Sequence, residues 1–160
     1  MSTRAVPAPQ VTLAAGGSAD LDSVIDVMSA AFDDRFGESW TRSQCAGILP
    51  MPGVRLILAR IDGEAAGFSL YRTVSDEAEL LLLAVAPRFR RQGIGRLLLD
   101  HFLNAARENG AGRVHLEVRE GNPAVIMYRN AGFTVAGRRV KYYHGRFGGQ
   151  FDALTLNRSL

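Results

Sequence analysis

The spacing of hydrophobic residues in the first third of the chain predicts a short strand followed by two helices. Residues 11–15 are apolar enough for a strand, and apolar residues recur at helical spacing over residues 21–32. Ser18 or Asp20 is placed to cap this helix, because a side-chain oxygen there accepts a hydrogen bond from an unpaired backbone N–H. Residues 33–53 are predicted to form a loop and a short helix that ends at two prolines.

The middle third of the chain has the pattern of three successive strands. Residues 54–61 and 64–74 are rich in β-forming side chains, and the Asp-Gly pair between them is a strong signal for a hairpin turn. The next run, residues 78–87, is apolar at nearly every position. This pattern suits a strand that is covered on both faces, and Pro87 is expected to end it.

The last part of the chain adds two helices and three strands to this pattern. Apolar residues return to helical spacing over residues 94–109 and then alternate with polar residues over 113–120. A short helix is expected within residues 122–132, followed by an antiparallel pair of strands over 133–143 and 150–160. This order predicts an α/β fold in which one mixed, mostly antiparallel sheet is flanked by helices. Its strand–helix–strand unit should form a parallel crossover.

The composition is typical of one globular domain. The chain has 160 residues, of which 47% are hydrophobic and 22% are charged, and this length can bury a sizeable core. We expect a single domain over residues 11–160, preceded by a flexible tail over residues 1–10. Cys45 is the only cysteine, so an intrachain disulfide cannot form. Since no signal-peptide pattern and no apolar run of membrane-spanning length is found, the sequence predicts a cytoplasmic protein.

Charge argues against nucleic acid as a partner and histidine placement against a metal ion, as the lack of a long apolar run argues against a membrane. The formal net charge is +3, and Lys141 is the only lysine among the basic residues. This bias is too small for a nucleic-acid signature, although residues 140–147 mix basic and aromatic side chains as nucleic-acid-binding segments do. His101, His115 and His144 are too scattered for a metal site. Nucleic acid, a membrane and a metal ion are therefore not expected partners.

The turn that follows the strand at residues 78–87 is the strongest candidate for a binding site. Backbone N–H groups and the positive end of a helix dipole meet there, and both attract a phosphate group. A dinucleotide fingerprint would need a third glycine where Leu98 stands, and a P-loop would need a Gly-Lys pair, which the sequence lacks. The remaining pattern is RxxGxG, at Arg90, Gly93 and Gly95. A turn whose glycines serve only close packing is the alternative.

Three segments carry a resemblance to a known family, namely LLLLAVAPRFRRQGIGRLLLDHFL, VHLEVREGN and MYRNAGF. With these segments the chain, from about residue 21 to residue 156, resembles the GNAT superfamily of acyl-CoA-dependent N-acetyltransferases. Its LEVR motif, tandem tyrosines, closing DALTL and early FGESWTRSQC are most similar to ribosomal-protein-alanine N-acetyltransferases of the RimI type. The resemblance implies a GNAT-like acyl-CoA N-acyltransferase fold, acetyl-CoA as co-substrate, and acetyl transfer to the N-terminal α-amine of a protein, ribosomal by likeness.

The resemblance places acetyl-CoA in a V-shaped opening between the strand that ends at Val85 and the strand that carries Glu117. It implies that three strand residues pair with the pantetheine amides, that the N–H of Val85 binds the thioester oxygen, and that the glycine turn holds the pyrophosphate. The implied cofactor-binding residues are Leu83, Ala84, Val85, Arg91, Gln92, Gly93, Ile94, Gly95, Arg96 and Asn122. Backbone donors aimed at phosphate or at developing negative charge suit this chemistry. A solvated charge is the alternative for Arg91 and Arg96, and a helix-opening role for Asn122.

Glu117 and Tyr128 are the catalytic candidates. An acetyl acceptor must be a neutral amine, and an α-amine of ordinary pKa, about 7.7 to 8.0, is about a quarter neutral at about pH 7.4, whereas a lysine amine is almost wholly charged. Glu117 is the candidate base, directly or through a water, and a salt bridge to an arginine is the alternative. By resemblance Tyr128 protonates the departing thiolate, and packing against Phe133 is the alternative.

The spacing between Asn122 and Tyr128 departs from the family pattern. It is six residues where the family usually has seven, and one missing residue would turn a helix by about 100°. The difference must therefore fall in the loop if Tyr128 is to face the cofactor.

Trp40, Tyr142 and Tyr143 resemble an aromatic wall around the first residue of the substrate. Core packing is the alternative for Trp40, and strand alternation predicts that only one of the two tyrosines faces the groove. Two other functions stay open, namely transfer to a small-molecule amine or a lysine, and a non-catalytic acyl-CoA-binding module. The presence of Glu117 and Tyr128 argues against the second of these.

Overall fold

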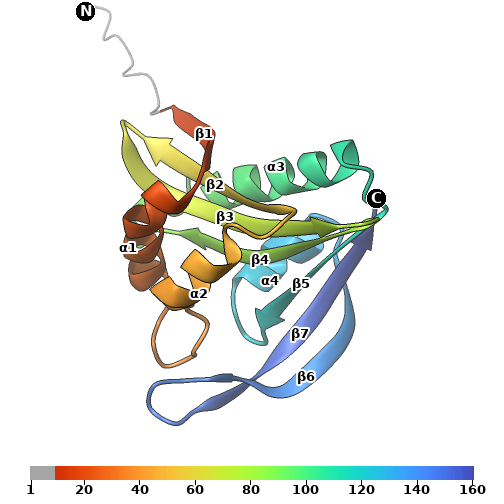
Figure 1. The fold of residues 1–160 in the computed structure, drawn as a ribbon. Coiled ribbons are helices and arrows are strands. Elements are labelled where there is room, and N and C mark those ends of the chain that lie inside the picture. Colours follow the sequence, from red (N-terminus) through yellow and green to blue (C-terminus); the bar gives the residue numbers. More distant parts are fainter. Residues whose placement is uncertain (1–9) are drawn as a thin grey trace, which may run out of the picture.

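Seven strands of the computed structural model form one mixed sheet (Figure 1). The structure describes residues 10–160, so the expected tail lies, apart from Gln10, outside the described residues. The strands are β1 (Val11–Gly16), β2 (Val54–Ile61), β3 (Glu64–Val74), β4 (Glu77–Val85), β5 (Arg113–Arg119), β6 (Thr134–His144) and β7 (Gln150–Ser159). Their order in the sheet is β1-β2-β3-β4-β5-β7-β6, and β4 with β5 is the one parallel pair among them. The predicted mixed, mostly antiparallel sheet is confirmed.

Two helices cover each face of this sheet. They are α1 (Leu21–Ala31) and α2 (Arg42–Ile48) on one face, and α3 (Ile94–Glu108) and α4 (Ala124–Asn130) on the other (Figure 1). α1 and α2 pack on one hydrophobic core, which contains Met28 and Phe68. α3 and α4 pack on the other, which contains Phe102 and Leu116. The order of helices and strands along the chain is the predicted one.

The ends of two elements differ from the prediction in detail, and a third element begins with a cap that was not predicted. The strand expected at residues 78–87 begins at Glu77 and ends at Val85, because Pro87 opens a short 3-10 turn. Asp20 directly precedes α1, but its carboxylate accepts a hydrogen bond from the Gly17 N–H at 2.9 Å instead of capping that helix. α2 does have a capping box, since Thr41 and Gln44 exchange side-chain and backbone hydrogen bonds.

A bulge in β4 separates this strand from β5. Leu70 of β3 pairs with Leu82 and the next residue, Tyr71, pairs with Leu80, so Leu81 is an extra residue in β4. β4 and β5 then pair no further than Leu80 and Leu116, although both strands continue. A bulge bends the strand that contains it and interrupts its ladder of hydrogen bonds. The result is a V-shaped opening in the middle of the sheet, between the strand that ends at Val85 and the strand that carries Glu117.

Gly67 fixes how closely α3 approaches the end of β4. This glycine is buried in β3, and a Cβ atom there would lie 2.7 Å from the carbonyl oxygen of Ala84. The same Cβ would lie 3.4 Å from the side chains of Ile94 and Leu98 in the first turns of α3. The missing side chain therefore lets the N-terminus of α3 lie against the end of β4.

We expect Gly67→Ala to lower the free energy of unfolding by about 1 to 3 kcal/mol, because the added methyl group must displace a backbone carbonyl. Urea denaturation followed by circular dichroism measures this loss. Gly47→Ala is the matched control, since Gly47 lies exposed in α2 with no atom within 4 Å of its Cβ position. That change should raise stability by about 0.5 to 1 kcal/mol, and an equal loss in both variants would contradict the packing argument.

Candidate active site

Two adjacent cavities lie along the opening between β4 and β5. The larger, called the long cleft, has a volume of about 700 Å³, and the smaller, called the inner pocket, about 150 Å³. Both are lined by the same five residues where they meet, namely Phe32, Glu38, Leu83, Asn122 and Ala124. The two cavities therefore form one site with a long part and a short part.

The edge of β4 forms one wall of the long cleft. Leu83, Ala84 and Val85 line it, and they lie beyond the last residues that pair with β5. β3 occupies the other edge of β4 up to Val85. Backbone N–H and C=O groups of the bulged end are therefore left facing the cleft, where an extended ligand with amide groups can pair with them.

The N-terminus of α3 forms the end of the long cleft. Gly93 precedes the helix with φ +77°, and Arg91 has φ +64°, so the turn uses the left-handed region twice. Arg91, Gly93, Ile94, Gly95 and Arg96 line the cleft, whereas Gln92 lines neither cavity. The N–H groups that begin a helix have no partner within it, and together with the helix dipole they attract an anion. Arg96 is paired with Asp100 at 2.9 Å.

Glu117 forms part of the wall of the inner pocket. It lies on β5 past the end of the β4 pairing, and its side chain is 16% exposed. Its carboxylate accepts a hydrogen bond from the Thr155 hydroxyl at 2.9 Å and pairs with Nε of Arg139 at 3.0 Å. The arginine salt bridge left open by the sequence is therefore present, in a carboxylate that also faces the pocket.

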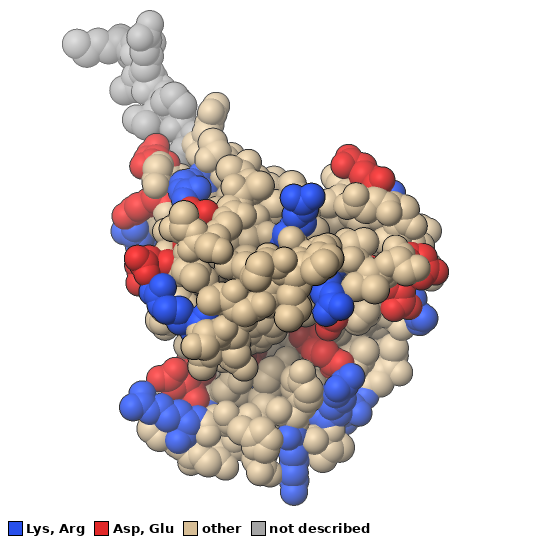
Figure 2. Space-filling model, in the orientation of Figure 1, with Lys and Arg blue, Asp and Glu red and all other residues tan. Residues whose placement is uncertain are grey.

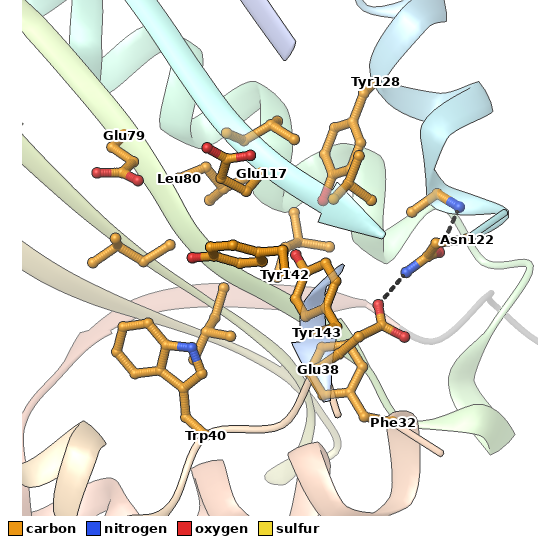
Figure 3. Close-up of a pocket in the computed structure, with 16 residues that line it drawn as sticks. Phe32, Glu38, Trp40, Glu79, Leu80, Glu117, Asn122, Tyr128, Tyr142 and Tyr143 are labelled. Carbon is orange, nitrogen blue, oxygen red and sulfur yellow. Dashed lines mark hydrogen bonds between the residues drawn. The ribbon is translucent and has the colours of Figure 1, made fainter. Parts of the chain in front are cut away.

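Tyr128 reaches the inner pocket from α4, on the other face of the sheet (Figure 3). Its side chain is buried and packs edge-to-face against Phe133, with 6.0 Å between the ring centres. Burial, and then the carboxylate of Glu38, raises the pKa of Tyr128 well above its usual value, so the phenol keeps its proton. Asn122 lies in the loop before α4 and lines the same pocket.

Tyr142 and Tyr143 both line the inner pocket, and the prediction that only one of them faces it is wrong. Between Arg139 and Tyr143, β6 has more residues than the segment of β7 with which it pairs, and Lys141 lies in the left-handed region with φ +53°. This irregularity interrupts the strict alternation of side chains. The two tyrosine rings contact each other edge-to-face, with 4.9 Å between their centres.

Trp40 packs against the core and also lines the inner pocket. Its side chain packs against the core beneath α1, and its backbone N–H lies 3.3 Å from the sulfur of Met28. The same residue lines the inner pocket opposite the two tyrosines (Figure 3). Trp40 is thus a rigid part of the pocket wall.

Glu38 connects the α1–α2 loop to the end of β5 and to the loop after it, and the sequence did not predict this residue. Its carboxylate accepts a hydrogen bond from Nε of Arg119 at 2.9 Å. It accepts another from Nδ2 of Asn122 at 2.7 Å (Figure 3). About nine-tenths of each charged side chain of the Arg119 pair is buried, and the guanidinium stacks on the Phe36 ring at 3.7 Å. The amide oxygen of Asn122 accepts from the Ala124 N–H at 2.9 Å, so the helix-opening role is also present. The one signal in the sequence was a glutamate in a loop between aromatic residues.

The α1–α2 loop and the β6–β7 hairpin meet beside the inner pocket. A side chain on Gly37 would collide with the carbonyl group of His144, and one on Gly145 with the carbonyl group of Arg35. The two backbones come this close because both positions are glycine. Figure 1 shows the hairpin tip passing beneath the loop, so the segments that carry Trp40 and the two tyrosines are held together.

The surface on the side of the α1–α2 loop and the hairpin carries charges of both signs. Lys and Arg are interspersed with Asp and Glu over the face shown in Figure 2, and acidic side chains lie in the hollow above the hairpin. Within residues 10–160, no group of three or more His, Cys, Asp and Glu is placed to hold a metal ion. In the same part of the chain, no helix is both long enough and apolar enough to cross a membrane.

Known proteins share both the sequence pattern and the fold. The sequence profile of the acetyltransferase (GNAT) family matches residues 21–133. The [ribosomal protein bS18]-alanine N-acetyltransferase of Escherichia coli K12 is 41% identical over 83 residues, which are 51% of this chain and 56% of that protein. The streptothricin acetyltransferase of Streptomyces lavendulae is 40% identical over 87 residues, or 52% of this chain and 46% of that protein. The match thus spans about half the length of these relatives.

The fold comparison covers nearly the whole chain. The crystal structure of the ribosomal-protein-S18-alanine N-acetyltransferase from Escherichia coli superposes with a TM-score of 0.82 and 29% identity, over 94% of each chain. The family match includes β4, the glycine turn, β5 and Tyr128, which line parts of the two cavities, whereas Tyr142 and Tyr143 lie beyond the matched residues. The chain therefore belongs to the acetyltransferase (GNAT) family.

Proposed function

We propose that this protein transfers the acetyl group of acetyl-CoA directly to the free N-terminal α-amine of a protein, in a ternary complex. The observation that carries the proposal is that Glu117 and Tyr128 both reach the inner pocket, where it adjoins the long cleft. The relatives named for acetylation of a ribosomal protein support a ribosomal acceptor. The cytoplasm, where acetyl-CoA and newly made proteins are both found, is the proposed compartment.

The long cleft has the features that acetyl-CoA requires. The edge of β4 at Leu83, Ala84 and Val85 would pair with the pantetheine amides, and the N-terminus of α3 at Gly93 would receive the pyrophosphate. Gly95, at the start of α3, lies close to the Met127 side chain of α4, because a Cβ there would lie 3.3 Å from the sulfur of Met127. When bound, acetyl-CoA supplies an acetyl thioester, a good acyl donor.

Glu117 is proposed to accept the proton of the attacking amine, directly or through a water. The Arg139 ion pair and the Thr155 hydrogen bond hold the carboxylate in one orientation. Since an α-amine has an ordinary pKa of about 7.7 to 8.0, a modest base suffices at neutral pH.

Tyr128 is proposed to donate a proton to the departing thiolate. A buried phenol that keeps its proton is a weak acid at rest, so the transfer has to occur as the thiolate leaves and its negative charge develops. Asn122 is proposed to contact the cofactor from the loop before α4, where it lines both cavities.

The inner pocket is proposed to hold the first residue of the acceptor protein. Phe32, Trp40, Tyr142 and Tyr143 surround a volume of only about 150 Å³. A pocket of this size and aromatic lining suits a small residue at the end of a chain. Transfer to a small-molecule amine is the second candidate, favoured by the similarity to the streptothricin acetyltransferase.

Mass spectrometry of peptides incubated with the protein and acetyl-CoA tests the proposed function. Each peptide carries an internal lysine and either a free or a blocked N-terminus. We expect the label only on free N-termini. Label on lysines, or on no peptide while streptothricin is acetylated, would contradict transfer to a protein N-terminus.

Gly93→Val should weaken acetyl-CoA binding by about tenfold or more, because a branched residue at φ +77° distorts the turn that presents the helix N-terminus. Isothermal titration calorimetry measures the affinity. Gly110→Val is the matched control, since Gly110 lies just past the other end of α3 with φ +82° and, like Gly93, has nothing within 4 Å of its Cβ position. Equal losses of affinity in both variants would show that general strain, not the anion site, is responsible.

Glu117→Gln should lower kcat by about a hundredfold at pH 7, and part of the loss should be recovered as the pH rises, because the neutral fraction of the amine increases. Steady-state kinetics from about pH 6.5 to about pH 9.5 measure the recovery of kcat, because this range spans the pKa of the amine. Arg139→Met removes the ion pair but keeps the carboxylate. If Glu117 served only that ion pair, both variants would lose activity equally, and this outcome would refute the assignment of the base.

A further inference from the structure

Three carboxylates line the inner pocket, those of Glu38, Glu79 and Glu117. Glu38 is paired with Arg119 at 2.9 Å, and Glu117 is paired with Arg139 at 3.0 Å. Each of these two charges is thus balanced by a guanidinium group. Glu79 is the third carboxylate, and no guanidinium group of the described residues lies within 4.0 Å of it.

Glu79 has no comparable partner. Among the described residues, the one basic group within 4.0 Å of its carboxylate is the imidazole of His115, 3.6 Å away, which is charged only when protonated. Arg72 lies opposite Glu79 on β3, but it is exposed, lines neither cavity and forms no ion pair with it within that distance in residues 10–160. The side chain of Glu79 is 37% exposed, so a ligand in the pocket can reach it. The pocket therefore retains one negative charge for a substrate to neutralise.

Glu79 lies at the end of the inner pocket that is away from the long cleft. It pairs in register with His115, whereas Glu117 lies two residues further along β5, which corresponds to about 7 Å at the usual rise of a strand. Leu83, which lines both cavities, lies further along β4 in the same direction. Figure 3 shows the same order, with Glu79 at one side of the group and Tyr128 and Asn122 at the other.

A bound peptide would therefore pass Glu79 on its way out of the pocket. An extended chain advances about 3.3 Å per residue, so a peptide whose amine lies at Glu117 brings its second or third residue to Glu79. The rings of Trp40 and Tyr142 line the same pocket, and aromatic faces attract cations. Acidic side chains are visible in the hollow above the β6–β7 hairpin in Figure 2.

Resting on the proposed function, we propose that Glu79 makes the pocket select protein N-termini that carry a lysine or arginine at the second or third residue. The cation replaces the missing partner of the carboxylate, and a neutral residue leaves that charge unbalanced. An acidic residue at these positions is repelled. Glu79 is thus a specificity-determining residue, without a part in the proton transfers.

Peptides that share alanine as the first residue and differ at the second or third test this proposal. Lysine, its uncharged analogue norleucine, and glutamate are compared at each position. For one of the two positions, we expect kcat/KM for the lysine peptide to exceed that for norleucine by about fivefold, the scale of a half-exposed ion pair, and the ratio to fall as salt is added. Glu79→Gln should bring the ratio close to one, and Glu79→Lys should favour the glutamate peptide.

Glu77→Gln is the matched control, because Glu77 is exposed on the same strand and lines neither cavity. This variant should keep the wild-type ratio. A wild-type protein that does not distinguish lysine from norleucine at either position would overturn the proposal. A ratio that survives in Glu79→Gln would overturn it equally.

Failure of the proposed function would be seen separately, as the absence of acetylation on every peptide. In that case calorimetry of the same peptides with the CoA-bound protein decides the role of Glu79. Tighter binding of the lysine peptide by the wild-type protein than by Glu79→Gln supports the proposal. Equal affinities refute it.

Discussion

Hydrogen bonding between β4 and β5 ends at Leu80 and Leu116, and the rest of the site depends on the separation of the two strands beyond these residues. The bulge at Leu81 turns β4 away, which leaves a strand edge unpaired in the middle of the sheet. Unpaired backbone groups in a protein interior are costly unless a ligand or water satisfies them. The same gap lets Tyr128, from α4, reach a pocket that is also lined by Phe32 and Trp40 from the α1 and α2 face. One extra residue thus creates both a binding edge and a passage through the sheet.

Buried polar contacts hold the two sides of this gap at a fixed separation. Glu38 comes from the α1–α2 loop, whereas Arg119 and Asn122 come from the end of β5 and the loop after it. A buried ion pair adds little net stability, because removing two charges from water costs about as much as their attraction returns. Its effect is to fix the relative positions of the two segments, since neither partner can move without leaving a buried charge unpaired. The contact between Gly37 and the hairpin adds a second fixed point.

The order of elements, the parallel β4–β5 pair and the glycine turn at the start of α3 could be predicted because each depends on local pattern. Alternation of Val114, Leu116 and Val118 fixed the face on which Glu117 lies, and the glycine spacing marked the start of α3. The irregular strands could not be predicted, because a bulge reflects pairing with a distant strand. For that reason Tyr142 and Tyr143 were expected on opposite faces. Glu38 and Glu79 were missed because their roles depend on contacts between segments far apart in the chain.

The partners of Glu117 come from the hairpin that also supplies the pocket tyrosines. Arg139 lies on β6 and Thr155 on β7, whereas the carboxylate itself lies on β5. A ligand that displaces the hairpin therefore alters the electrostatic surroundings of the carboxylate at the same moment that it fills the pocket. The same hairpin therefore lines the pocket and supplies the partners of the Glu117 carboxylate. A substitution in the hairpin would consequently change the contacts of the Glu117 carboxylate together with the lining of the inner pocket.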